Sequence, residues 1–555
     1  MTHTRWSARL ALCVGIAVAG CTDLLNEDPK GFTTTDTFFK TGADLNSATI
    51  AIYNALRGLQ GTSNWTAPEL ASDQARYDNR EPNFNTQSPD FLAWDASTGR
   101  TGAYWGTLYS VITRANLVLD KGPAIETPNQ QMKDGNLAEA KFFRGYAYFF
   151  LTKVYDGVPL LLSPEEQANP RPTRAPVEDV HQAAIRDLTD AANALPETWP
   201  GSDGFGIPTQ GRVTKGAAQM ALADLYVWRS SYMQTNEWQD ASDWADSVIQ
   251  SGTWALNPDY VRTFRPSNKG NREMIFYLTN TGLDSRTSNI FQLFYYPRDW
   301  GLDLGQGGGW GLIHPTYWFW NSYLPGDYRR STGVNYTTDA AYVARGCGIS
   351  GDCGDNPDSS LADGPMPWKY KKSDGGATWW LGDVDVPLYR FAEAILIYAE
   401  AQNELGNTGE AVTHLNLIRA RARKGTGSEN RLEPHDYGTA GEPLDQASVR
   451  EAIYMERAWE LAFEAKRWFD LVRRDYMPGE AGYWANSLVT HDSISARQPP
   501  PDTLDVRDGN RRVTSADALP HKRRFPIPQT QIDANPALCQ NAGYGGKACP
   551  AGVQP

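Results

Sequence analysis

Residues 456–473 read Glu456-Arg457-Ala458-Trp459-Glu460-Leu461-Ala462-Phe463-Glu464-Ala465-Lys466-Arg467-Trp468-Phe469-Asp470-Leu471-Val472-Arg473, and this stretch decides the fold of the chain. Small and apolar residues recur in it at helical spacing, which predicts one long helix from Ala447 to about Arg474. The expected buried stripe consists of Ala458, Leu461, Ala462, Ala465, Trp468, Phe469 and Val472. After this helix the chain is rich in proline and glycine, so we expect it to end as coil.

Three carboxylates of the same stretch, Glu456, Glu460 and Glu464, share one face of the predicted helix. Paired carboxylates hydrolyse glycosidic bonds in many enzymes, so a glycosidase has to be considered. The positively charged residues nearby in the sequence are Arg457, Lys466, Arg467 and Arg473. A ladder of ion pairs three and four residues apart is the ordinary explanation for such a row. We therefore expect no catalysis from it.

Helical periodicity also extends over most of the chain before this stretch. It predicts helices over residues 45–59, 104–119, 137–155, 177–194, 214–232 and 238–249. Within 391–418, Ala399 is followed by Ala411, Leu415 and Ile418, the spacing of a tetratricopeptide unit, in which alanines let two antiparallel helices pack closely. The predicted fold is mainly α, with tetratricopeptide-like helix pairs that form an α-α superhelical body.

One long segment, residues 257–385, breaks this pattern. It is rich in glycine, proline, tyrosine and tryptophan, as in Gly307-Gly308-Gly309-Trp310 and Trp318-Phe319-Trp320. Segments of this length without helical period in a compact protein are usually functional loops. We predict an irregular, loop-rich insert in the helical body.

The N-terminus has the features of an export signal. Arg5 and Arg9 precede an apolar run over residues 10–19, which is too short to cross a bilayer as a helix. The run ends in Val18-Ala19-Gly20-Cys21, which resembles a bacterial lipobox, so we expect cleavage before Cys21 and acylation of that residue. The alternative is an ordinary cleavage site with an incidental cysteine.

Composition limits the partners. Hydrophobic residues make up 41% of the chain, which is typical of a globular protein, and the formal net charge is -13. Such a charge repels nucleic acid, which is therefore excluded as a main partner.

The remaining cysteines form two close pairs, Cys347 with Cys353 and Cys539 with Cys549. Their spacing, and the lack of histidines nearby, favours two local disulfides over a zinc site. Glu410 and His414 lie one helical turn apart, but no third metal ligand is evident. A calcium site remains open at the acidic loop between the first two cysteines, although its spacing is not that of an EF-hand. The acidic-loop residues are Asp352, Asp355, Asn356 and Asp358.

Residues 456–473 resemble the C-terminal signature of the SusD/RagB family of outer-membrane lipoproteins. Further family landmarks follow in family order along the chain. They are Glu69–Asp73, Arg114–Asn116, Ala138–Arg144, Gly211–Lys215, Arg390–Glu393, Ala399–Ala401, Pro526–Pro528, Asn535–Pro536 and Gln540–Tyr544. The resemblance covers essentially the whole chain after the export signal.

The resemblance implies a surface-exposed, lipid-anchored protein of the outer membrane that captures a glycan and hands it to a SusC-like TonB-dependent transporter. It implies neither catalysis nor a cofactor. The expected parts are a signal peptide (1–20), a lipidated tether (21–40), an N-terminal SusD-like helical region (41–256), the insert as ligand face (257–385), and a C-terminal RagB/SusD helical region with the tail (386–555). A peptide-binding tetratricopeptide-like lipoprotein and, less favoured, a helical glycoside hydrolase are the alternatives.

Sugar sites pair exposed aromatic rings with a few polar groups, because pyranose rings have flat C–H faces and polar edges. We prefer Trp94 and Trp320, because family members draw such rings from the loop after the first helix and from the insert. The other candidates are Trp65, Trp300, Trp310 and Trp318, with Asp78, Asn79 and Arg80 as polar partners. The alternative for each tryptophan is a structural role, since most tryptophans pack loops onto a protein's body.

Overall fold

The computed structural model describes residues 38–77, 87–202, 209–283, 288–295, 310–324, 326–332, 334–335, 366–367, 369–370, 381–424, 432–497 and 513–554. Several residues named above lie outside these ranges: Cys21, Asp78, Asn79, Arg80, Trp300, Cys347, Cys353, Asp352, Asp355, Asn356 and Asp358. None of the helices in the described ranges is long and apolar enough to cross a membrane.

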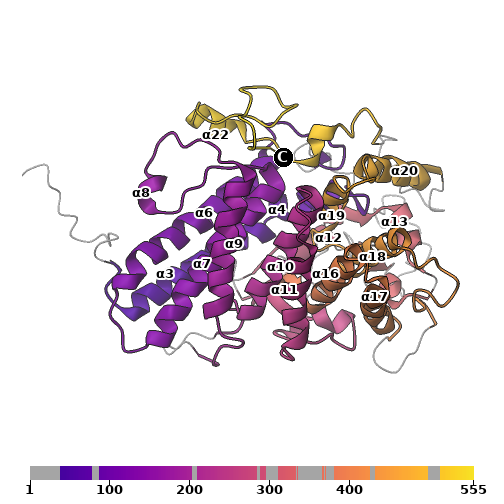
Figure 1. The fold of residues 1–555 in the computed structure, drawn as a ribbon, viewed down its shortest axis with the longest axis horizontal. Coiled ribbons are helices and arrows are strands. Elements are labelled where there is room, and N and C mark those ends of the chain that lie inside the picture. Colours follow the sequence, from indigo (N-terminus) through magenta and orange to yellow (C-terminus); the bar gives the residue numbers. More distant parts are fainter. Residues whose placement is uncertain are drawn as a thin grey trace, which may run out of the picture.

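Helices dominate the fold, as predicted (Figure 1). The long ones are α3 (Gly42–Leu56), α6 (Gly99–Lys121), α7 (Gln130–Tyr155), α9 (Val177–Ala194), α10 (Lys215–Tyr232), α11 (Trp238–Gln250), α16 (Phe391–Glu404), α17 (Thr408–Ala422), α18 (Gln446–Glu460) and α20 (Tyr483–Arg497). The shorter ones are α4 (Thr62–Leu70), α8 (Pro164–Gln167), α12 (Phe291–Tyr295), α13 (Tyr317–Ser322), α14 (Tyr328–Thr332), α19 (Arg467–Arg474) and α22 (Gln529–Ala534).

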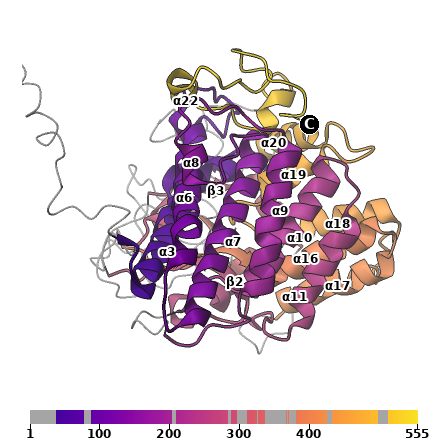
Figure 2. The same cartoon turned by 60° about the vertical axis from the view of Figure 1, so that its left-hand side comes forward.

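Neighbouring helices pack in a continuous row from α3 through α6, α7, α9, α10, α11 and α16 to α17 and α18 (Figure 2). Small residues allow the close approach: Ala399 on α16 and Ala411 on α17 are fully buried. Polar caps define the helix starts; Thr41 accepts the backbone N–H of Asp44 at 3.2 Å, and the Asp44 carboxylate accepts the N–H of Thr41 at 2.7 Å. The predicted α-α superhelical body is confirmed.

Of the helices that were not predicted, α4 and α20 are the longest, and α8, α12, α13, α14 and α22 are shorter. α4 contains Pro68 and a weak apolar period, so residues 62–70 pass for a loop in the sequence. α20 lies in a region that we expected to be coil because of its proline and glycine content, although Trp484 and Leu488 are buried one helical turn apart. In both cases tertiary packing and not local periodicity decides the structure.

The predicted long helix over residues 447–474 is wrong, because it breaks into α18 and α19. Phe463 and Ala465 between them have φ of 61° and 57°, in the left-handed region that ends a helix. The freed backbone groups find partners from elsewhere: Lys369 Nζ donates to the carbonyl of Ala462 at 2.7 Å, and the hydroxyl of Tyr370 donates to that of Phe463 at 2.8 Å. The insert therefore anchors at this break.

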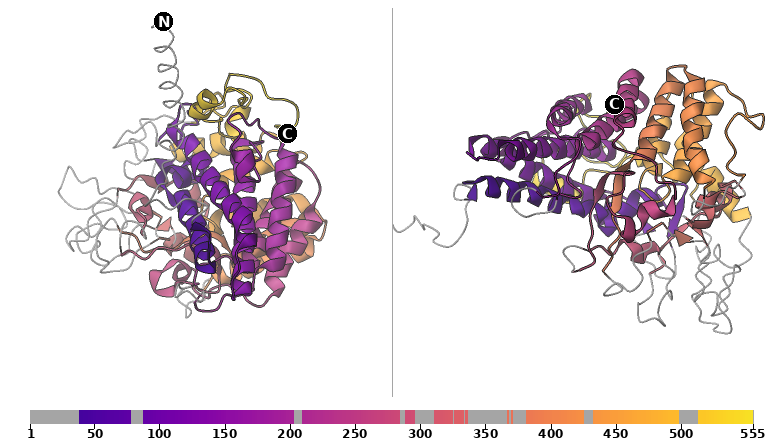
Figure 3. Two further views of the ribbon diagram at one scale, coloured as in Figure 1. Left: turned by 90° about the vertical axis from the view of Figure 1, so that its left-hand side faces the viewer. Right: turned by 90° about the horizontal axis from the view of Figure 1, so that it is seen from below.

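Two short antiparallel strand pairs tie the insert to the body, and a third pair lies within the insert. β2 (Met274–Leu278) pairs with β6 (Val386–Arg390), β1 (Ala75–Tyr77) with β3 (Ile313–Pro315), and, within the insert, β4 (Val334–Asn335) with β5 (Met366–Pro367). Phe276 of β2 packs edge-on against Phe142 and Tyr146 of α7. The described parts of the insert lie on one side of the helix row (Figure 3). The division of the chain into five parts stays a prediction.

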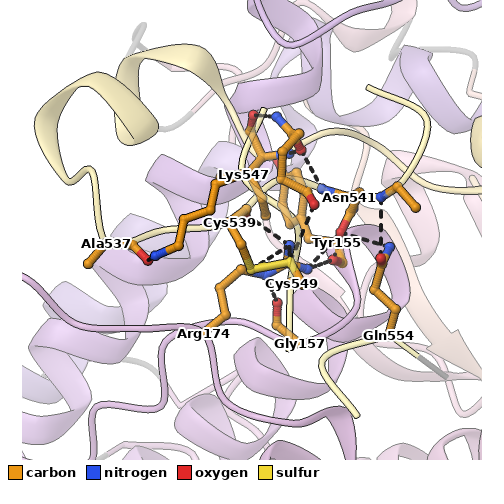
Figure 4. Close-up of a disulfide and its surroundings, with 12 residues drawn as sticks. Tyr155, Gly157, Arg174, Ala537, Cys539, Asn541, Lys547, Cys549 and Gln554 are labelled. Atoms are coloured by element: carbon orange, nitrogen blue, oxygen red, sulfur yellow. Dashed lines mark hydrogen bonds between the residues drawn. A yellow bond between two sulfur atoms is a disulfide. The ribbon is translucent and has the colours of Figure 1, made fainter. Parts of the chain in front are cut away.

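Figure 4 shows one of the points at which the C-terminal tail is fastened to the N-terminal helices. Cys539 and Cys549 form a disulfide, which is one of the two pairings expected from the sequence. Beside it, Arg174 donates to the Cys539 carbonyl at 3.1 Å, to the Tyr155 carbonyl at 2.8 Å and to Asn541 Oδ1 at 2.7 Å. A buried arginine that donates to the tail and to the end of α7 at once holds the tail in place.

Candidate ligand-binding surface

The carboxylate row of the signature stretch is buried and not a surface ladder. Glu456, Glu460 and Glu464 are at most 3% exposed. Their basic partners come from distant segments: Arg329, Lys369, Arg390, Arg419 and Arg421. Asp327 and Glu273 pair with the same arginines, and all these residues together with the three glutamates form what we call the ionic cluster. The expectation of pairs three and four residues apart is therefore wrong for these three glutamates, because the row faces the insert and not solvent.

Glu460 is the centre of the ionic cluster. Its carboxylate accepts Arg390 Nη1 at 2.6 Å and Arg329 Nη1 at 3.1 Å, and it also binds Arg421. Burial alone would raise the pKa of Glu460, but Arg421, Arg390 and Arg329 together hold this pKa far below its usual value. A carboxylate that stays ionised among three guanidinium groups is a structural anchor and is not poised as an acid or base.

Trp94 and Trp65 are interior residues, at 1% and 3% exposure. Trp94 Nε1 donates to the hydroxyl of Tyr544 at 2.7 Å, and its ring packs edge-on against Phe525 at 5.1 Å. Neither ring offers a face to a sugar, so we correct the choice of both as binding residues. The sequence predicts that Trp94 lies in a loop, but it does not show that the C-terminal tail covers this loop.

Trp318 and Trp320 keep part of their surface exposed on the short helix α13. Phe319 between them is fully buried. Because successive residues are about 100° apart around a helix, burial of Phe319 turns the two tryptophans to the two flanks of α13. They frame the exposed residue Asn321, on the side that faces away from the core. Figure 1 shows α13 at the same end of the body as α18 and α20.

Each of these two rings lies against a polar partner. The Trp318 ring stacks on the imidazole of His491 with 3.4 Å between ring centroids and 8° between planes. The guanidinium carbon of Arg330, on α14, lies 4.2 Å from the centroid of the Trp320 ring. Such contacts fix the orientation of a ring that is only half-buried. We call Trp318, Trp320, Asn321, Arg330 and His491 the aromatic surface.

His491 is held by a buried ion pair. Its Nδ1 lies 2.8 Å from Asp73 Oδ2, and Asp73 also accepts Arg467 Nε at 2.8 Å and Nη2 at 2.9 Å. Burial would raise the pKa of Asp73, but Arg467 and His491 hold it well below its usual value. His491 was not among the predicted site residues, because α20 was expected to be coil and a single histidine in coil gives no signal.

A small hollow, with room for about one water molecule, adjoins this arrangement. Its lining includes Asp73, Arg76, Asp90, Thr316 and Leu488. Asp73 is thus shared between the hollow and the support of His491.

The other predicted site residues are not part of this arrangement. Trp310 is half-buried and packs edge-on against Phe294 of α12 at 5.1 Å. Glu410 and His414 lie 3.4 Å apart on α17, and the described residues contain no group of three side chains that could hold a metal. Trp300, Asp78, Asn79 and Arg80 lie outside the described ranges.

Helix pairs that support a loop-built aromatic surface define a class of α-helical binding protein. Two family models match the chain: "SusD family" over residues 349–544 and "Starch-binding associating with outer membrane" over residues 25–227. The chain belongs to the SusD family.

Relatives and solved structures agree. The chain is 26% identical over 524 residues to "SusD-like protein P2" of Formosa agariphila, a match that covers 89% of this chain and 96% of that one. A SusD homologue from Bacteroides thetaiotaomicron shares the fold, with a TM-score of 0.71 at 20% identity over 91% of this chain and 98% of the other. A "Laminarin binding SusD-like protein" has a TM-score of 0.67 at 21% identity, covering 91% and 100%.

Proposed function

We propose that this protein is a cell-surface lipoprotein that captures a glycan or oligosaccharide and delivers it to a SusC-like TonB-dependent transporter of the outer membrane. The ligand binds at the aromatic surface, where Trp318 and Trp320 stack on pyranose rings. No catalytic step belongs to this function.

One observation carries the proposal: two partly exposed tryptophans flank one short helix, and each is fixed by a stacked polar partner. Rings held in this way lose little conformational freedom on binding, which favours affinity for a weakly interacting ligand such as a sugar. The family description as starch-binding and the laminarin-binding name of a solved neighbour agree with a glycan as ligand.

The anchor and the transporter rest on the sequence. The lipobox-like stretch ending at Cys21 provides the anchor, and residues 22–40 provide a tether that lets the body move over a transporter while it stays at the membrane. We expect a Cys21→Ala variant to appear in the soluble fraction with unchanged glycan affinity. If the variant loses both its retention at the membrane and its glycan affinity, the anchor is misassigned.

Native affinity electrophoresis tests ligand binding. Gels that contain single polysaccharides should retard the wild-type protein in at least one case, and Trp318→Ala or Trp320→Ala should remove that retardation. Trp244→Ala, a half-buried tryptophan of α11 outside the aromatic surface, is the matched control and should migrate like wild type. Unchanged retardation of both surface variants would place the ligand elsewhere, and binding of peptides without any glycan affinity would favour the peptide-binding alternative.

A further inference from the structure

Two neighbouring arginines of α14 have opposite surroundings. Arg329 is fully buried and pairs with Asp327 at 2.7 Å, Glu456 at 2.7 Å and Glu460 at 3.1 Å. Arg330 is half-buried and lies over the ring of Trp320. Arg329 therefore belongs to the ionic cluster, and Arg330 belongs to the aromatic surface.

Arg330 has no acidic partner among the described residues. Its polar contact is with Asn321 Oδ1, at 3.4 Å from Nη2, and its Nε atom is buried without a hydrogen-bond acceptor. A guanidinium has five N–H donors, and a buried donor that lacks an acceptor costs free energy. When a guanidinium stacks on an aromatic ring, its N–H groups still point outward in its own plane, where they can bind an anion with two parallel hydrogen bonds.

The composition of the chain makes this isolation informative. The chain has 65 acidic and 52 basic residues, so carboxylates are not scarce. The net charge of -13 does not prevent an anion from binding here, because salt screens charges over about 8 Å at physiological ionic strength. Local donors then outweigh distant carboxylates.

We infer that the ligand is an anionic glycan, one whose sugar units carry a carboxylate or a sulfate group, and that Arg330 is the residue that selects for this group. The inference rests on the proposed function and adds the class of ligand to it. Trp318 and Trp320 bind the sugar rings, and the guanidinium of Arg330 binds the charged substituent beside them. A neutral glycan would offer no charged acceptor to this guanidinium.

Isothermal titration calorimetry of the full mature protein tests this inference. The probes are polygalacturonate for the carboxylate, carrageenan for the sulfate, and laminarin as a neutral polymer. We expect binding to one of the two acidic polymers, weakened by added salt. Arg330→Gln should reduce that affinity at least about tenfold, because hydrogen bonds to charged groups are worth more than neutral ones. Arg330→Lys, which keeps the charge but not the planar fork, should fall between wild type and Arg330→Gln.

Arg171→Gln is the matched control, since Arg171 is an exposed arginine of the loop after α8, and it should bind as wild type does. Thermal unfolding checks that Arg330→Gln is folded. The inference is overturned if Arg330→Gln binds the acidic polymer unchanged, or if neither acidic polymer binds. If laminarin alone binds and Trp320→Ala abolishes this binding, the proposed function stands and the inference about charge fails.

Discussion

The ionic cluster and the aromatic surface lie on the two sides of α14 and use the same side chains in different ways. In the ionic cluster every guanidinium named above meets at least one carboxylate, and the centre is dry. In the aromatic surface Arg330 meets an indole ring and an amide. The first arrangement fastens the insert to the helices, and the second leaves hydrogen-bonding capacity for a ligand. The comparison shows that pairing with carboxylates, more than residue type, distinguishes a structural arginine from a candidate binding arginine in this protein.

Glu460→Ala gives the largest expected effect on the scaffold side of this comparison. It leaves Arg329, Arg390 and Arg421 without their shared carboxylate, and removal of one partner from a buried ion pair typically costs about 3–5 kcal/mol. Chemical denaturation should show a loss of this order in the free energy of unfolding. A loss below about 1 kcal/mol, the range of an exposed ion pair, would mean that the ionic cluster is not what holds the insert.

The next effect depends on pH and concerns Glu69, which lies at the break between α18 and α19. Burial raises the pKa of Glu69 to about 8, while its carboxyl accepts the backbone N–H of Ala465. The unfolded chain releases the Glu69 proton above the ordinary pKa of about 4.5, whereas the folded protein keeps it up to about pH 8. This group therefore makes the fold less stable as pH rises from about 4.5 to 8.

Glu69→Gln removes that titration and keeps an acceptor for Ala465. Its stability relative to wild type should increase over the same interval, by at most about 1.4 kcal/mol per pH unit. Unfolding free energies at pH 4.5, 6 and 8 measure the trend. A difference between variant and wild type that does not change with pH would show that Glu69 is ionised in the folded protein.

The smallest effect is expected at the loop between α17 and α18. His435 Nδ1 lies 2.7 Å from Glu433, and its Nε2 contacts Glu442, while Arg419 donates to its carbonyl at 3.2 Å. Only the protonated imidazole donates to both carboxylates, and these hydrogen bonds to Glu442 and Glu433 raise the pKa of His435 above 6.5. The contribution is present below about pH 6.5 and is lost as pH rises through the raised pKa.

Since the group is partly exposed, we expect less than about 1 kcal/mol from it. At pH values below 6.5, His435→Gln should lower the thermal unfolding midpoint, and at pH 9 it should have no effect. Glu442→Gln should likewise lower the midpoint more at low pH than at pH 9. An effect of His435→Gln that is equal at both pH values would argue for simple packing.

The sequence predicts much of the fold because most helices carry their own periodicity. Residues 177–194 and 238–249 coincide with α9 and α11 within one residue. The break after Glu460 is invisible in the sequence, because Phe463 and Ala465 continue an apolar pattern while Lys369 and Tyr370, nearly a hundred positions away, satisfy the freed carbonyls. Long-range partners of this kind leave no local pattern.

The site was less accessible to prediction for the same reason. The sequence offered both Trp318 and Trp320 as candidates, but it preferred Trp94 to Trp318, and the C-terminal tail buries Trp94 through Tyr544. Arg330 looks identical to Arg329 in the sequence, and only the structure shows that one has three carboxylates and the other has none among the described residues. Burial and pairing depend on tertiary contacts.

The double variant Trp318→Ala/Trp320→Ala tests the central claim most directly, with glycan retardation and thermal unfolding measured on the same preparation. We predict that retardation by every polysaccharide that binds the wild type disappears, while the unfolding midpoint stays close to that of Trp244→Ala. Retained binding by a folded double variant would contradict the account, because it would place the ligand outside the aromatic surface.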